Sequence, residues 1–201
     1  MGRRSDHSRA ELTALIVSEG QKQMAETGFA RFSAREVAKR IGYSIGTIYN
    51  VFGSYDMLIL AINGRTMQLW ARFLKDRLDK AAPGADRLAV LVEGYFDFAQ
   101  SNPNVWTALY DHRLPTGELP PDWYGEQRAP LIGLVIEEIA AALPEAQRHR
   151  ALDLARSLVA TVHGHCALAI SGTFYLLGGD SPFDAAMERV REAMAAACSP
   201  A

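Results

Sequence analysis

The side chains best suited to binding a metal lie together in the stretch VHGHC at residues 162–166. Imidazole nitrogens and thiolates are the preferred ligands of zinc. The surrounding pattern predicts a helix, however, and residues two apart on a helix point in different directions, so His163 and His165 do not meet at one ion. Cys166 lies on the same face as His163, but a single pair of ligands makes a poor site. The sequence therefore predicts no metal site and no cofactor.

We expect none of three common catalytic features: a Gly-x-Ser-x-Gly nucleophile elbow, a phosphate-binding loop or a His-Glu-x-x-His pair. A small helical enzyme acting on an apolar substrate is one alternative, but only scattered His and Asp residues support it. A helical adaptor that binds only protein is another. The two cysteines, Cys166 and Cys198, are too few for a disulfide framework. We expect a protein without enzymatic activity.

The composition is that of an ordinary globular protein, with 49% hydrophobic and 22% charged residues. No window approaches eighteen consecutive apolar residues, and the polar start of the sequence lacks the apolar middle of a signal peptide. We therefore expect a cytoplasmic protein with reduced thiols and no membrane contact. Residues 1–56 carry eight Lys and Arg against six Asp and Glu, whereas residues 57–201 carry thirteen against seventeen. This asymmetry favours an anionic partner near the N-terminus.

The hydrophobic pattern is helical along nearly the whole chain, since Val, Ile and Thr never form the alternating runs typical of strands. It predicts helices at residues 9–27, 34–41, 45–51, 55–80, 86–100, 104–111, 123–142, 146–175 and 183–197. Stretches rich in Pro and Gly, such as APGAD and LPTGELPPD, separate several of them. The predicted fold class is all-α, with about nine helices.

Two of these helices are short and closely spaced, in the stretch REVAKRIGYSIGTIYNVF. Ser33 followed by Glu36 predicts a capping box at the start of the first helix. Gly42 permits the positive φ that ends this helix sharply, and Ser44 is a suitable N-cap for the second. Two short helices joined by a glycine-containing turn make a helix-turn-helix. Ile48 gives the second helix its buried side, which leaves the outward positions Ile45, Gly46, Thr47, Tyr49 and Asn50.

The stretch FSAREVAKRIGYSIGTIYNVFGSYDML resembles the DNA-binding segment of TetR-family transcriptional regulators. The likeness lies in the capped first helix, the spacing of Ala38 and Gly42, and Phe52 followed by a turn into a long helix. It implies an N-terminal three-helix DNA-binding domain at 1–54, with a boundary inside the helix 55–80. It also implies a larger helical domain at 55–201 for effector binding and dimerisation. The implied partner is palindromic, double-stranded operator DNA.

The resemblance implies that the recognition helix contacts DNA through its first turns. Thr47 and Tyr49 fall where the family contacts backbone phosphates. Base edges in the major groove are reached from the start of this helix. The positions that match this role are Ser44, Ile45 and Gly46, with Asn50 beside them.

Two further positions flank the recognition helix. Arg35 sits where many family members contact either a base or a phosphate, and both possibilities stay open. Tyr55 replaces a lysine that usually binds phosphate. The Tyr55 hydroxyl, or the free N–H groups of the helix that begins there, would then hold that phosphate.

Large aromatic and histidine side chains gather in the second part of the chain. The resemblance implies an effector pocket between the middle helices, for a mostly apolar ligand with a few polar atoms. We predict that it is lined by Trp106, Tyr110, Trp123 and His163. The alternative is that these are core residues, with His163 a hydrogen-bonded core histidine.

The last two predicted helices carry long apolar stripes. The stripes either form the core of a single chain or, as the resemblance implies, build a four-helix interface in a two-fold homodimer. The predicted interface residues are Leu158, Met187, Val190 and Met194. A dimer would place its recognition helices about 34 Å apart, one turn of DNA. The sequence thus predicts a nucleoid-associated, homodimeric repressor that an effector releases from its operator.

Overall fold

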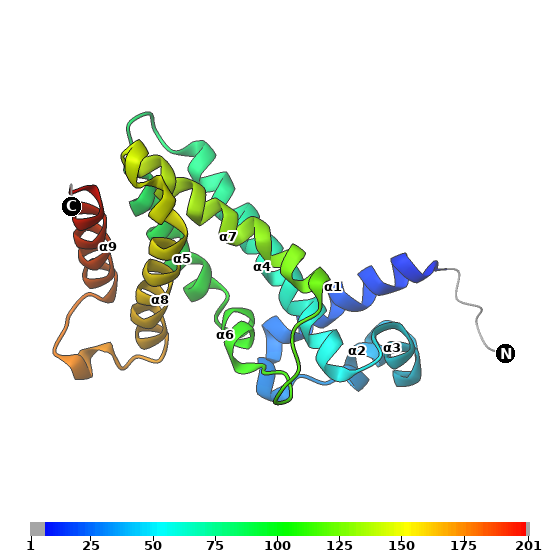
Figure 1. The fold of residues 1–201 in the computed structure, drawn as a ribbon. Helices are drawn as coiled ribbons and strands as arrows, with labels where there is room; N and C mark the ends of the chain where they lie inside the picture. The colour runs from blue at the N-terminus through cyan, green and yellow to red at the C-terminus, as the bar shows by residue number, and fades with distance from the viewer. Residues whose placement is uncertain (1–6, 200–201) are drawn as a thin grey trace. The chain divides into compact units, whose positions relative to one another are not determined.

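The computed structural model describes residues 7–199, and these form nine α-helices and three short 3-10 helices without a strand (Figure 1). The prediction of an all-α fold is confirmed. The α-helices are α1 (Arg9–Thr27), α2 (Ala34–Arg40), α3 (Ile45–Phe52), α4 (Tyr55–Lys80), α5 (Arg87–Ser101), α6 (Pro103–Asp111), α7 (Asp122–Ala142), α8 (Ala151–Ile170) and α9 (Pro182–Cys198). The 3-10 helices are η1 (Phe29–Arg31), η2 (Glu145–Arg150) and η3 (Phe174–Leu177).

The chain divides into two compact units, which we describe separately. Unit 1 holds the described residues up to Gln68 together with Asn102–Arg128, and unit 2 holds Leu69–Ser101 together with the described residues from Ala129 onward. The division falls twice within a helix, once in α4 and once in α7. Helix α6 belongs to unit 1, although the sequence assigned it to the second domain. The first six residues of the predicted DNA-binding domain lie outside the described residues.

Unit 1 is built around one apolar core to which α1, α2, α3, α4 and α6 contribute. Helix α1 begins at a capping box, in which the Glu11 N–H donates to Ser8 Oγ and the Ser8 N–H donates to Glu11 Oε2. It ends at Gly28, whose φ is +74°. The buried core residues include Leu12, Ile16, Met24, Val37, Ile48, Leu58, Ile59, Ile62, Val105 and Ala108.

The predicted capping box of α2 is only half correct. The Glu36 N–H does donate to Ser33 Oγ at 3.3 Å, but the Ser33 N–H donates to Gln23 Oε1 at 3.1 Å. Gln23 is a buried residue of α1, and its amide oxygen accepts the Ser33 N–H, which the Glu36 side chain was expected to accept. The Glu36 carboxylate instead accepts from Arg40 Nε at 3.5 Å. A tertiary contact has replaced a local one.

The turn between α2 and α3 has the predicted chemistry. Gly42 adopts a φ of +77°, and the next N–H, of Tyr43, donates to the carbonyl of Ala38 at 2.9 Å. Ser44 caps α3, because its Oγ accepts from the Thr47 N–H at 3.2 Å. Local residue types are sufficient to specify this turn.

Helix α6 is held in unit 1 by polar contacts as well as by its buried apolar side. The buried Asn63 of α4 donates from Nδ2 to the carbonyl of Ala108 at 3.2 Å. Asn104 donates from Nδ2 to the carbonyl of Ala25 at 2.7 Å. The ring of His112, just after α6, lies with Nε2 2.9 Å from Asp56 Oδ1. These bonds connect α6 to α1 and to the first turns of α4.

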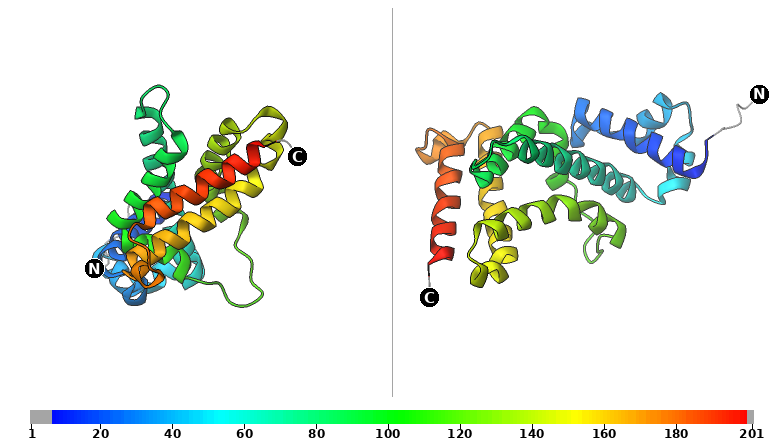
Figure 2. Two further views of the ribbon diagram at one scale, coloured as in Figure 1. Left: turned by 90° about the vertical axis from the view of Figure 1, so that its left-hand side faces the viewer. Right: turned by 90° about the horizontal axis from the view of Figure 1, so that it is seen from above.

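Unit 2 contains α5, α8 and α9 with the adjoining parts of α4 and α7, and α8 and α9 lie side by side (Figure 2). The predicted single helix over 146–175 is wrong. Residues Glu145–Arg150 form a 3-10 turn, and α8 ends at Ile170. Gly172 has a φ of +66°, and the Thr173 N–H donates back to the carbonyl of Leu168, which is the bonding of a Schellman motif. Because the apolar pattern of the sequence continues past Ile170, the pattern does not show where the helix ends.

Among the described residues, no single helix is long and apolar enough to cross a membrane. The pair α3 and α4, bent by 76°, passes the same test by length and composition only. Its buried residues Ile48, Leu58 and Ile62 belong to the core of unit 1.

Candidate nucleic-acid interface and ligand cavity

Helix α3 presents a polar face to solvent because its apolar side is fixed in the core. Ile48 is fully buried, whereas Tyr49 is 42% exposed, and Gly46 and Asn50 are exposed as well. Ile45 is half-buried and packs against the core of unit 1. The face that can enter a groove therefore consists of Gly46, Tyr49 and Asn50, with Ile45 at its edge.

Two of the predicted DNA contacts also take part in the cap of α3. The hydroxyls of Ser44 and Thr47 lie 3.1 Å apart, and Ser44 Oγ accepts the Thr47 N–H. Ser44 is exposed and Thr47 is half-buried. Each hydroxyl has donor and acceptor capacity beyond one such bond, so these residues position the start of α3 and remain available to a phosphate.

The two arginines of α2, Arg35 and Arg40, differ in their ionic contacts. Arg40 is surrounded by carboxylates, with Glu26 at 2.9 Å, Glu19 at 3.4 Å and Glu36 at 3.5 Å. Arg35 is exposed in the first turn of α2 and has no hydrogen bond or ion pair among the described residues. Its guanidinium is therefore free to bind a phosphate or a guanine edge.

Tyr55 is held differently from a phosphate-binding lysine. Its ring lies against Phe32, with centroids 6.1 Å apart, and is partly buried against the core. Burial raises the pKa of its hydroxyl above the usual value, so the group stays neutral. Ser54 Oγ accepts the Met57 N–H at 3.2 Å, which already satisfies one donor at this end of α4.

The segment GYSIG at 42–46 also matches the Gly-x-Ser-x-Gly pattern of serine hydrolases, a match that the sequence analysis missed. That pattern needs a strand before the serine and a histidine beside it. Ser44 instead follows a helical turn and contacts Thr47. The serine is a helix cap.

The stretch VHGHC does not gather its side chains around one point. His163 Nδ1 lies 3.1 Å from the Tyr95 hydroxyl, whereas His165 Nδ1 donates to the carbonyl of Thr161 at 2.8 Å. Across residues 7–199, no three His, Cys, Asp or Glu side chains are grouped as metal ligands.

The two cysteines are expected to differ sharply in reactivity. Cys166 is fully buried, and burial raises its pKa to about 12, so its thiolate is scarce at neutral pH. Cys198 is exposed. Iodoacetamide should therefore label Cys198 in the folded protein and Cys166 only after unfolding, as peptide mass spectrometry would show. Since the unfolded thiol ionises at lower pH than the folded one, Cys166 should also make the fold less stable as pH rises above about 9. Rapid labelling of both cysteines at neutral pH would contradict this assignment.

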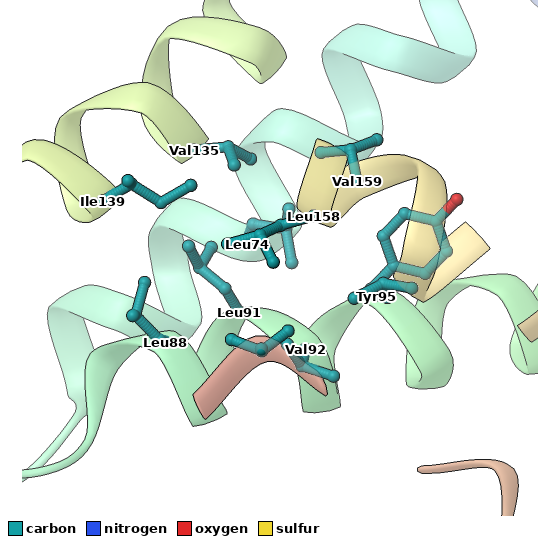
Figure 3. Close-up of a pocket in the computed structure, with 11 residues that line it drawn as sticks. Leu74, Leu88, Leu91, Val92, Tyr95, Val135, Ile139, Leu158 and Val159 are labelled. Carbon is teal, nitrogen blue, oxygen red and sulfur yellow. The ribbon is translucent and has the colours of Figure 1, made fainter. Parts of the chain in front are cut away.

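A small apolar cavity of about 50 Å³ lies inside unit 2 (Figure 3). Its lining comes from α4, α5, α7, α8 and α9: Leu74, Leu88, Leu91, Val92, Tyr95, Val135, Ile139, Leu158, Val159, Val162 and Val190. Among these described residues, Tyr95 alone has a polar side-chain atom, and its hydroxyl is paired with His163. Burial lowers the pKa of His163 below its usual value, so the imidazole is neutral at pH 7.

The four residues predicted to line an effector pocket do not line this cavity. Trp106, Tyr110 and Trp123 belong to unit 1, where the rings of Trp106 and Tyr110 lie 5.1 Å apart. His163 belongs to unit 2, where its Nδ1 lies 3.1 Å from the hydroxyl of the lining residue Tyr95. A pocket formed by these four residues stays a prediction. The aliphatic lining was missed because Leu and Val at helical spacing look the same whether they border a cavity or fill a core.

The four predicted interface residues are all buried within unit 2 of a single chain, and Leu158 and Val190 border the cavity. These side chains are already covered within one chain, and an interface that includes them stays a prediction. Of the two interpretations of the apolar stripes, the structure supports the core of the single chain.

Comparison with known proteins links this geometry to a family. Residues 16–62 match the model for bacterial regulatory proteins of the tetR family, and residues 88–194 match the model for the tetracyclin repressor-like C-terminal domain. An HTH-type transcriptional regulator of Mycobacterium tuberculosis is 26% identical over 151 residues, covering 71% of this chain and 62% of that protein. The counterpart from Mycobacterium bovis gives the same values. The chain thus spans less than two thirds of the length of these curated relatives.

Solved structures share the fold. A protein of unknown function from Rhodococcus sp. RHA1 superposes with a TM-score of 0.70 at 18% identity, covering 98% of this chain and all of that one. The multidrug binding protein EbrR, complexed with imidazole, gives 0.60 at 23% identity and covers 98% of each chain. A TetR family transcription regulator from Marinobacter aquaeolei VT8 gives 0.57 at 16% identity, over 90% of this chain and 94% of that one.

The two family models fall on the two functional parts of the chain. The N-terminal model covers the helix-turn-helix, and the C-terminal model alone spans more than half of the sequence, including the helices around the cavity. The chain therefore belongs to the TetR family of DNA-binding transcriptional regulators, a family that is not enzymatic.

Proposed function

We propose that this regulator is a homodimeric repressor, and that a small, mostly apolar molecule binding in unit 2 releases it from a palindromic operator. The observation that carries the proposal is the combination, in one chain, of an outward polar face on α3 and an apolar cavity in unit 2. EbrR, which shares the fold, is described as a multidrug binding protein. Because its partner is DNA, the protein would work in the cytoplasm at the nucleoid.

The DNA contacts follow from exposure. Tyr49 and Arg35 extend from unit 1 without being needed for its core, and phosphates are their natural partners. Gly46 allows the backbone of α3 to approach base edges, and Asn50 can pair with adenine in the major groove. Ile45, at the edge of this face, is suited to contact a thymine methyl.

Dimerisation would use the outward sides of α8 and α9, since the inward sides form the core. On α8 these exposed positions include Ala160 and Gly164, whose small size lets a second helix approach closely. A two-fold axis through such a contact would pair the two recognition helices with the two halves of a palindrome.

Effector control would act through α4, which is one continuous helix. Its first turns supply Leu58 and Ile59 to the core of unit 1, and its later turns supply Leu74 to the cavity. The cavity is smaller than the roughly 300 Å³ of a typical ligand pocket, so a larger effector would have to displace lining side chains. A shift of α4 that changes DNA affinity by a coupling energy of about 1–3 kcal/mol is sufficient for regulation.

Tyr49→Phe tests the DNA-binding face directly. Loss of a hydrogen bond to a charged phosphate costs about 1.5 kcal/mol, or roughly tenfold in affinity per subunit. Because phosphates carry no sequence information, the loss should be equal on DNA from upstream of the gene and on random DNA. Fluorescence anisotropy titrations measure both.

Tyr175→Phe is the matched control, since Tyr175 is a tyrosine of unit 2 that is 69% exposed, and this variant should bind as the wild type does. If Tyr49→Phe and Tyr49→Ala both bind every DNA with unchanged affinity, Tyr49 does not contact the backbone.

A further inference from the structure

Two exposed basic side chains at the start of α1 lie beside the recognition helix α3. The Arg9 guanidinium donates from Nη2 to the carbonyl of Val51, in the last turn of α3, at 3.5 Å. His7 Nδ1 lies 3.0 Å from the Tyr43 hydroxyl, and the two rings meet edge to face. Tyr43 directly precedes Ser44, the N-cap of α3. Arg9 and His7 therefore lie next to the two opposite ends of α3.

Neither side chain belongs to the core of unit 1. His7 and Arg9 are exposed, and the first buried residue of α1 is Leu12. Helix α3 is held in place by the buried Ile48, which comes from its other side. The side chains at this end of α1 are thus open to a partner that approaches α3.

Arg9 carries its charge without a counter-ion among the described residues. Other cations of the same unit are paired with carboxylates, namely Lys22, Lys39 and Arg40. A guanidinium has five N–H donors, and the contact with Val51 uses one of them. Two adjacent donors of a guanidinium fit the oxygens of a phosphate. Arg9 can therefore keep its contact with α3 while it binds DNA.

His7 offers a second donor. When the Tyr43 hydroxyl donates to Nδ1, the ring carries its proton on Nε2. This N–H points away from Tyr43, and the residue is exposed. A phosphate oxygen is a suitable acceptor for it.

The side chains, rather than the end of the helix, would make these contacts. Ser8 Oγ accepts the Glu11 N–H, and the Glu11 carboxylate accepts the Ser8 N–H. This capping box satisfies two N–H groups of the helix and places a negative charge in its first turn. An anion directly at the helix end is disfavoured there, whereas Arg9 and His7 extend toward α3.

We propose that Arg9 and His7 each contact a phosphate of the operator, so that the start of α1 holds the DNA backbone beside the groove that α3 enters. The inference rests on the proposed function, in which α3 reads the operator. It adds backbone contacts from a helix outside the helix-turn-helix. Because phosphates carry no base sequence, these contacts strengthen binding to operator and to random DNA alike.

Arg9→Gln tests the charge. Glutamine removes the charge but keeps an N–H donor for the Val51 carbonyl. Each phosphate contact contributes about 0.9 to the slope of log K against log salt, so the slope should become shallower by about 0.9 for each bound subunit. Arg9→Lys keeps the charge and should keep the slope. Fluorescence anisotropy titrations of random-sequence duplex DNA over a series of salt concentrations measure all three proteins.

Arg31→Gln is the matched control. Arg31 is also exposed, and its Nε also donates to a backbone carbonyl, that of Thr27 at 3.2 Å. It lies past the other end of α1, whose 19 residues span about 28 Å. At about 0.1 M salt, exposed charges are screened beyond roughly 10 Å, so this variant should keep the slope of the wild type.

His7→Phe tests the second contact, because phenylalanine keeps a ring beside Tyr43 and removes the donor. DNA affinity should fall roughly tenfold per subunit, the usual effect of losing a hydrogen bond to a charged group. His149→Phe makes the same change at an exposed histidine of η2 in unit 2 and should bind as the wild type does. Unchanged affinity in His7→Phe would overturn the contact of His7.

The slopes separate a phosphate contact from a structural role of Arg9. If Arg9 only stabilised the negative end of α3, Arg9→Gln would weaken binding by the same factor at every salt concentration and leave the slope unchanged. That result, or wild-type binding at every salt concentration, would overturn the inference. The proposed face of α3 is tested independently: if Arg9→Gln loses slope while Tyr49→Phe and Tyr49→Ala bind as the wild type does, the start of α1 binds DNA and the role assigned to Tyr49 is wrong.

Discussion

Replacing Met187 with aspartate is expected to unfold the chain rather than to release a folded monomer. Met187 lies on the inward side of α9 and is only 3% exposed within a single chain. Burying an unpaired carboxylate costs several kcal/mol, a large part of the roughly 5–15 kcal/mol by which a typical domain is stable. Met187→Asp should therefore lose most of its helical circular dichroism at 25 °C or melt far below the wild type.

Ala196→Asp is the matched control on the same helix, because Ala196 is exposed. This variant should keep its helical signal, and if α9 takes part in the proposed dimer it should sediment as a monomer. The opposite pattern, a folded monomer from Met187→Asp and no change from Ala196→Asp, would place Met187 in an interface after all. Circular dichroism and analytical ultracentrifugation on the same samples decide between the two.

Ile48→Ala is expected to destabilise unit 1 by about 2–5 kcal/mol, the usual cost of deleting a fully buried aliphatic side chain. Ile48 is the buried residue of α3, so its loss releases the recognition helix from the core. Binding to operator and to random DNA should fall together, because the helix is no longer presented in one orientation. Urea unfolding and DNA titration measure the two effects.

Ile45→Ala makes the same chemical change one turn earlier on α3, where the side chain is only half-buried. Its cost in stability should be much smaller, and its main effect should be a changed preference among DNA sequences, since this position lies at the edge of the groove-facing side. Equal losses of stability in Ile45→Ala and Ile48→Ala would show that the two isoleucines are buried alike, contrary to the structure.

The sequence by itself determined the elements whose signals are local. Helix α1 runs from Arg9 to Thr27 and α4 from Tyr55 to Lys80, as predicted. The turn between α2 and α3 was also predictable, because Gly42 and Ser44 act on backbone groups within a few residues of themselves. The position of the recognition helix, and with it the family, follows from these local features.

Only the tertiary structure decided what each buried face packs against. An apolar stripe indicates that a side is covered, and it does not say by which partner, so Leu158 and Val190 were assigned to an interface although they face the interior of unit 2. The Ser33 N–H donates to Gln23, ten residues earlier, instead of to the nearby Glu36 side chain. The cavity depends on how five helices meet, which no spacing along one helix specifies. Hydrogen bonds within a turn are fixed by neighbouring residues, whereas packing is fixed by residues that the chain brings together only after it folds.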